Sequence, residues 1–200
     1  MNVIQDFFKA YYSQMEQYYL EFEADNYGLT KDNYWQKVMK PSGISEGDFK
    51  PTDQKLGFTL PDSFKEFYKS HYSLEQDFDT GGLFIAGNQE GSKLSSLVNY
   101  FFDHSLSPEI LKLGLIPFGM YNDEWYVCLN MNKNQEDPEI VLFESSNWGA
   151  GKDAVSHRPW FSNFYAFLKC ITDQQITGNN DNFNKLDLGN NYLTAYDHWK

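Results

Sequence analysis

The sequence predicts an acidic, soluble α+β protein in which helices pack on a mostly antiparallel sheet, with a helical extension at the N-terminus. Apolar residues recur at three- and four-residue steps near both ends of the chain, which is typical of helices with one buried face. Between residues 115 and 143, short runs of strand-forming residues alternate with polar loops, which favours an antiparallel meander over βαβ units. The 200 residues include 18% aromatic side chains, enough to bury the core of one domain.

The N-terminal helical extension, residues 1–40, is predicted to begin with a long amphipathic helix. Polar residues such as Lys9 and Glu16 fill one face, and the other face is wide and mostly aromatic. We expect the aromatic face to pack on the core of the protein. A face of this composition also suits a helix that binds a partner, and the sequence leaves both arrangements open. The apolar face consists of Ile4, Phe7, Phe8, Tyr11, Tyr12, Met15, Tyr18, Tyr19 and Phe22.

A turn-rich connector is expected over residues 41–55, where two prolines, two glycines and several short polar residues interrupt any helical period. This connector separates the extension from the main domain, which is predicted over 56–172. A helix should begin after Pro61, because proline is tolerated in the first helical turn and Asp62 suits the positive end of the helix dipole. The helix should end before the polar loop 73–82.

The remaining elements follow from the same helical and strand periods. The polar segment 130–138 indicates a hairpin-type connection between two strands, and the Asn-rich segment 173–200 is expected to form a C-terminal tail with little regular structure. We expect, in chain order, a strand over 83–86, a helix within 92–103, a helical turn over 108–113, strands over 115–119, 125–129 and 140–143, and a closing helix over 160–171.

The sequence contains no motif with a known catalytic or cofactor-binding mechanism. It has no glycine-rich phosphate loop, no H-E-x-x-H pair and no G-x-S-x-G turn. The four histidines are far apart in the sequence and lack the spacing of metal ligands. Cys128 and Cys170 lie in apolar segments, which predicts buried, reduced thiols. We therefore predict no enzymatic activity, no cofactor and no metal site.

Composition also indicates the cellular compartment and the classes of partner that suit the protein. The chain has no apolar run of the roughly 18 residues that span a bilayer, and its first residues do not resemble a signal peptide. The net charge of −12 argues against direct binding of nucleic acid, which depends on lysine and arginine. We expect a cytoplasmic protein that binds neither membranes nor nucleic acid directly.

Negative charge is densest in residues 121–144, which contain six acidic residues and one lysine. Such a stretch suits a basic protein partner, because opposite charges steer two surfaces together. Asp123 and Glu124 would point to opposite faces as neighbours on a strand, which does not suit paired acid–base catalysis. Trp148 stands in a polar segment with glycine, and tryptophan is frequent at binding hot spots. The candidate partner contacts are Asp123, Glu124, Glu136, Asp137, Glu139 and Trp148.

Six segments of the chain together resemble the SMI1/KNR4 (SUKH) superfamily. Its members similarly carry a helix that starts after Leu-Pro, a strand ending in Pro-Phe-Gly, a tyrosine-bearing strand and a closing aromatic helix. Asn130 departs from the family pattern, in which an aspartate often ends the tyrosine-bearing strand. The matching segments are LGFTLPDSFKEFYKSHY (56–72), LFIAG (83–87), LIPFG (115–119), EWYVCLN (124–130), EIVLFE (139–144) and WFSNFYAFLKCI (160–171).

The resemblance implies an α+β fold with a curved, mixed sheet and helices packed on one side. It also implies a bacterial immunity protein that binds and neutralises a cognate polymorphic toxin, often a nuclease. The acidic surface would then cover a basic surface of the toxin. The alternative, taken from the eukaryotic branch of the family, is a regulatory scaffold that binds several cellular proteins. Neither the sequence nor the resemblance fixes the oligomeric state.

Overall fold

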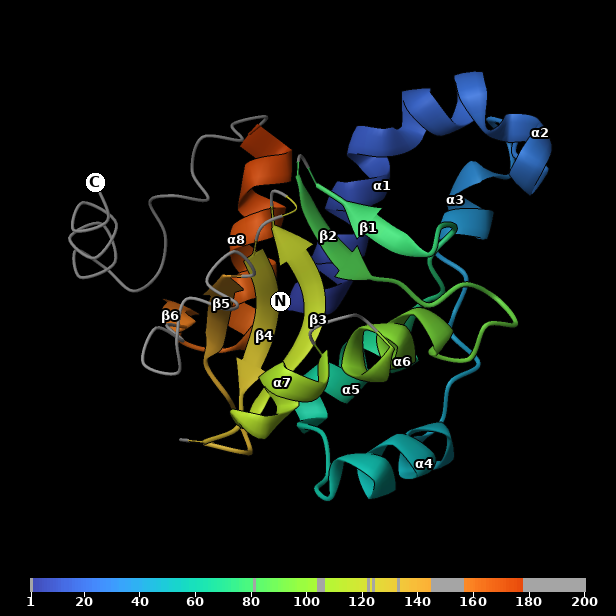
Figure 1. The fold of residues 1–200 in the computed structure, drawn as a ribbon. Helices are drawn as coiled ribbons and strands as arrows, with labels where there is room; N and C mark the ends of the chain where they lie inside the picture. Colours follow the sequence, from blue (N-terminus) through green and yellow to red (C-terminus); the bar gives the residue numbers. More distant parts are fainter. Residues whose placement is uncertain are drawn as a thin grey trace.

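Six antiparallel strands form one curved sheet in which each strand pairs with its neighbours in the sequence (Figure 1). The computed structural model describes residues 2–80, 82–103, 107–121, 123, 125–132, 134–144 and 157–177. The predicted α+β class and antiparallel meander are confirmed. The strands are β1 (Asp77–Asp79), β2 (Leu83–Ala86), β3 (Leu115–Tyr121), β4 (Trp125–Asn130), β5 (Ile140–Glu144) and β6 (His157–Phe161).

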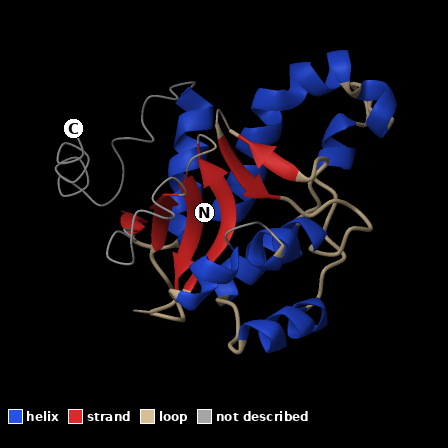
Figure 2. Cartoon of the chain, viewed as in Figure 1, coloured by secondary structure: helices blue, strands red, loops and turns tan. Residues whose placement is uncertain are grey.

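The described helices lie on both sides of the sheet (Figure 2), which corrects the expectation from the resemblance that they pack on one side. The predicted helix after Pro61 and the predicted helix within 92–103 are confirmed as α5 and α6. No described helix combines the length and apolarity that crossing a membrane requires. The helices are α1 (Val3–Phe22), α2 (Ala24–Tyr27), α3 (Tyr34–Val38), α4 (Glu46–Leu56), α5 (Asp62–Ser70), α6 (Ser95–Phe102), α7 (Ser107–Lys112) and α8 (Phe164–Thr177).

Alternating side chains of the central strands divide the core into two clusters. On β4, Val127 and Leu129 join the main cluster with residues of α1, α5, α6 and α8. The intervening Cys128 points to the opposite face, where Ile110 of α7 covers a smaller cluster. This alternation follows from the two-residue period of a strand. Cys128 and Cys170 are both buried and free, as the sequence predicts.

The first half of α1 docks directly on the main domain. Phe7 and Phe8 are buried and contact the rings of Phe67 on α5 and Phe78 on β1, with centroid separations of 5.3 to 5.5 Å. The helix also packs along α8, so the two ends of the described chain lie side by side. Of the two arrangements that the sequence leaves open, docking on the domain therefore applies to this half of the helix.

The connector expected over 41–55 is wrong for most of its length, because α4 occupies Glu46–Leu56. Ser45 and Asp48 form a capping box that satisfies the first N–H groups of the helix, with Ser45 N donating to Asp48 Oδ2 at 2.9 Å. Pro51 lies inside the helix, where it removes one backbone donor. The cap and the burial of Phe49 against the core offset this loss. A proline at this position therefore does not exclude a helix.

Two strands are missing from the predicted elements, and the closing helix is misplaced. Trp160 and Phe161 belong to β6, and α8 begins only at Phe164. Both rings are buried beside α8, which explains why their spacing resembles a helical stripe. The other missed strand is the three-residue β1, in the loop expected over 73–82. Helix α8 continues to Thr177, past the expected domain end at 172, and the rest of the predicted tail lies outside the described residues.

The Pro-Phe-Gly segment has a structural role in β3. A register shift between Pro117 and Gly119 marks a β-bulge opposite β4, a place where a strand tolerates a proline. A Cβ atom at Gly119 would lie 2.3 Å from the backbone oxygen of Phe84 on β2. The glycine therefore allows β2 and β3 to approach closely at the bulge.

Candidate interaction surfaces

The predicted acidic contacts occupy two different hairpin connections. Asp123 is exposed in the β3–β4 turn, with a backbone φ of 57°. Glu136 and Asp137 are exposed in the β4–β5 connection, and their backbone N–H groups donate to Asn134 Oδ1 at 3.0 and 3.3 Å. Glu139 is half-buried and accepts a hydrogen bond from Asn130 Nδ2 at 2.7 Å. Glu139 thus helps to close the hairpin.

These two connections lie at opposite ends of the sheet, because consecutive hairpins of a meander alternate ends. At about 3.4 Å per residue, the six residues of β4 separate the two connections by about 17 Å. The structure therefore does not bring Asp123 together with Glu136 and Asp137. Glu124 and Trp148, the other two predicted contacts, lie outside the described residues.

The β4–β5 connection is joined by acidic residues of α5, which the sequence analysis missed. The hydroxyl of Tyr165 on α8 donates to Glu66 Oε2 at 2.6 Å. Burial first, then this hydrogen bond, then the negative charges of Glu66, Asp137 and Asp62 raise the pKa of Tyr165 to about 12. Asp137 therefore acts electrostatically on the same tyrosine as Glu66 and Asp62 of α5. We call Asp62, Glu66, Glu136 and Asp137 the acidic end of the sheet.

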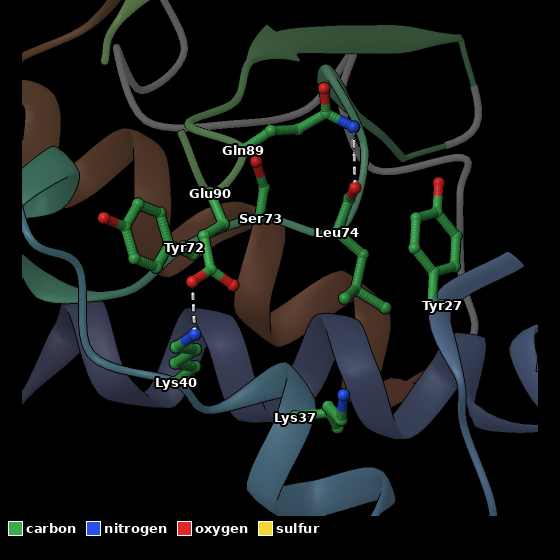
Figure 3. A pocket seen from close by; sticks show the side chains of 8 residues that line it. All are labelled: Tyr27, Lys37, Lys40, Tyr72, Ser73, Leu74, Gln89 and Glu90. Carbon is green, nitrogen blue, oxygen red and sulfur yellow. Dashed lines mark hydrogen bonds and ion pairs between the residues drawn. The ribbon is translucent and has the colours of Figure 1, made fainter. Parts of the chain in front are cut away.

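The pocket drawn in Figure 3 lies where the N-terminal helices meet the segments around β1 and β2. Its volume is about 320 Å³. Lys40 pairs with Glu90 across it at 2.5 Å, and Gln89 Nε2 donates to the backbone oxygen of Leu74 at 2.7 Å. These polar groups engage one another and leave no nucleophile paired with a base among the lining residues. The pocket is lined by Tyr27, Lys37, Lys40, Tyr72, Ser73, Leu74, Gln89 and Glu90.

A buried asparagine behind this pocket holds four segments together. Asn88 Nδ2 donates to Ser42 Oγ at 3.2 Å and to the backbone oxygen of Tyr68 at 3.3 Å. Its backbone N–H donates to Ser73 Oγ at 2.6 Å, and its Oδ1 accepts from the backbone N–H of Leu94 at 3.4 Å. Because buried amides are costly when unpaired, this arrangement fixes the pocket wall and assigns Asn88 a structural role.

The second half of α1 presents aromatic side chains to solvent. Across the described residues, three large hydrophobic side chains are exposed: Tyr18 (42%), Phe22 (69%) and Trp35 (40%). Tyr18 and Phe22 lie one helical turn apart, with ring centroids 5.7 Å apart. Tyr18 and Phe22 belong to the first helix, for which the sequence also leaves a partner-binding role open, and Trp35 lies on α3.

In the described part of the chain, no three His, Cys, Asp or Glu side chains lie close enough together to hold a metal ion. The sulfur of Cys128 is buried, and burial raises the pKa of its thiol well above the ordinary value. A thiol in this state is a poor nucleophile, because the thiolate is the reactive form.

Comparison with protein families gives one result. The model of the SMI1/KNR4 family (SUKH-1) matches residues 43–170. The match begins just before α4 and ends within α8, so it includes all six strands and leaves α1 to α3 outside. No curated protein matches the chain.

Proposed function

This chain belongs to the SMI1/KNR4 family (SUKH-1), and we propose that it is an immunity protein that binds and neutralises a cognate bacterial toxin. The family is known for immunity proteins rather than for enzymes. We place the toxin-binding surface at the acidic end of the sheet. Both α5 and the β4–β5 connection contribute acidic residues to it.

The acidic end has the properties of a surface for a basic protein. Asp62, Glu66, Glu136 and Asp137 are all exposed, on a chain with net charge −12. Opposite charge on a partner would accelerate encounter and fix the orientation of the complex. A toxin that cleaves nucleic acid has a basic substrate-binding surface, because it must neutralise phosphates. Covering that surface would block access of the substrate, and we place this event in the cytoplasm.

The first test is capture of the partner from the native host with the tagged chain at about 150 mM and about 500 mM salt, a range over which exposed charges are strongly screened. One stoichiometric, basic protein that is lost at high salt is the expected result. Several weakly bound partners would instead favour the regulatory scaffold. The absence of any partner would contradict both proposals.

The second test locates the interface with two variants of equal net charge. In the first variant, Asp62→Asn, Glu136→Gln and Asp137→Asn remove three of the four charges of the acidic end and leave Glu66 to accept its hydrogen bond from Tyr165. We expect this variant to bind the captured toxin about tenfold more weakly or worse at about 150 mM salt, measured by calorimetric titration. Neutralisation of the exposed Asp32, Asp103 and Asp123 to Asn is the control and should leave affinity nearly unchanged. Equal losses in both variants would show that only net charge matters.

A further inference from the structure

Helix α1 changes its surroundings halfway along its length. From Ile4 to Tyr12, six of its side chains are buried in or beside the main cluster, and of the later residues only Tyr19 is buried. Figure 1 shows the second half of α1 and the short α2 extending beyond the sheet. The same helix thus docks on the domain with one half and carries Tyr18 and Phe22 to the surface with the other.

The exposed rings form one face of this protruding segment. Tyr18 and Phe22 are separated by four residues, which places them on the same side of a helix. Tyr18 also contacts the ring of Tyr19, which in turn contacts Tyr12 and, on α2, Tyr27. Aromatic residues are enriched at binding sites because they offer a large contact area with few rotatable bonds. We call Tyr18, Phe22 and the acidic residues Glu21, Glu23 and Asp25 the N-terminal tip.

The segment that carries these rings is rich in negative charge. From Ala10 to Thr30, the sequence contains four acidic residues and no lysine or arginine. Glu75, in the loop before β1, adds to the same region: burial first, then the negative charge of Glu23, raise the pKa of its carboxyl. The nearby lysines Lys37 and Lys40 line the adjoining pocket, where Lys40 is paired with Glu90.

We propose that the N-terminal tip is a docking surface for a basic protein segment in which lysine or arginine side chains alternate with apolar ones. Such a segment would place its cations over the rings of Tyr18 and Phe22 and beside Glu21, Glu23 and Asp25, where cation–π and ionic attraction act together. A second copy of this chain is a poorer occupant, because its own tip would bring three further carboxylates into contact. As a contact to the toxin, this inference rests on the proposed function.

The position of the tip relative to the family match adds a consequence for specificity. The SMI1/KNR4 match begins at residue 43, so the tip belongs to a part of the chain that this family model does not cover. The tip can therefore contribute contacts to one particular partner in addition to those of the shared domain.

The direct test uses two labelled peptides and the full chain. One peptide alternates lysine and leucine in helical spacing, and the other has glutamate at each lysine position. Fluorescence anisotropy at about 50 mM and about 500 mM salt should show binding of the lysine peptide alone, weakened by salt. The double variant Tyr18→Gln and Phe22→Gln should bind this peptide at least about tenfold more weakly. The double variant Gln5→Ala and Ser13→Ala, at exposed positions of α1 outside the N-terminal tip, is the matched control.

Three results of the peptide and sedimentation experiments would overturn the inference. Unchanged peptide affinity in the Tyr18 and Phe22 variant would remove the rings from the site, and equal binding of both peptides would show non-specific adhesion. A dimer in sedimentation experiments that this variant abolishes would assign the tip to self-association. The toxin provides a separate test. If a captured toxin binds the tip variant with full affinity, the docking role of the tip is wrong, whereas the proposed function is unaffected. Failure to capture any toxin sinks the proposed function, whereas peptide binding still reports on the tip.

Discussion

One buried lysine joins α4 to α5. The side chain of Lys65 is 1% exposed, and its ammonium group contacts Glu46 at 2.5 Å and Asp53 at 3.2 Å. Burial by itself lowers the pKa of Lys65, but the hydrogen bonds to the two carboxylates outweigh burial and raise it. The raised pKa means that folding favours the charged form. This stabilisation is complete below the ordinary lysine pKa and is lost as pH rises through the raised value.

Replacement of Lys65 with methionine should therefore destabilise the protein. The variant leaves Asp53 half-buried without its cation, while the exposed Glu46 regains water, so we expect a loss of about 2 kcal/mol. Lys69→Met is the matched control, because Lys69 is 34% exposed and contacts only the exposed Glu46. It should cost less than about 0.5 kcal/mol. Urea denaturation of both variants at neutral pH measures the difference, and equal losses would contradict the bridging role of Lys65.

The charged carboxyl of Glu75, unlike the charged ammonium of Lys65, destabilises the folded protein. Burial first, then the charge of Glu23, raise the pKa of Glu75 above its ordinary value. The folded protein then binds this proton more tightly than the unfolded chain does, so stability falls as pH rises from the ordinary value through the raised one. Glu75→Gln removes this titration. We expect the variant to gain stability relative to the natural protein as pH rises from 5 to 8, by less than about 1 kcal/mol.

Urea denaturation across this pH range checks the expectation. Glu21→Gln removes the same charge from an exposed position and controls for net charge. A difference between the Glu75 variant and the natural protein that does not change with pH would show that the carboxyl is not responsible.

The two halves of α1 should respond very differently to the same substitution. Phe7 is fully buried among four aromatic rings, so Phe7→Ala should cost about 3–5 kcal/mol. Phe22 is 69% exposed, so Phe22→Ala should change stability by less than about 0.5 kcal/mol. Thermal and urea unfolding measure both values. A large loss in Phe22→Ala would mean that this ring belongs to the core and is not available for a partner.

At the scale of elements, the sequence predicts those whose signal is local and long. The helices α1 and α5 and the strands β3 to β5 all follow from periodicity, β propensity and the proline at a helix start. The three-residue β1 reads Asp-Phe-Asp and has no such signal, because only its pairing with β2 makes it a strand. Helix α4 was not predicted because it contains Pro51. The capping box and the buried contacts stabilise the helix by more than the proline destabilises it.

At the scale of the whole molecule, the topology decides which charges meet. The sequence identifies 121–144 as the densest acidic stretch, but the meander sends Asp123 to one end of the sheet and Asp137 to the other. It then brings both Asp62 of α5 and Asp137 within electrostatic range of Tyr165, although 75 positions separate the two carboxylates in the sequence. A linear count of charge could not find this grouping, because it arises from packing between elements that are distant in the chain.

The docking of α1 along α8 also has a consequence for synthesis of the protein. About 140 residues separate the end of α1 from the start of α8, and a ribosome needs on the order of ten seconds to add them. During that time, the face of α1 that packs along α8 has no partner helix. The hairpins of the meander can form one after another as they emerge, because each strand pairs with the next. We therefore expect the nascent chain to be a substrate for chaperones that hold exposed aromatic helices until the last helix is made.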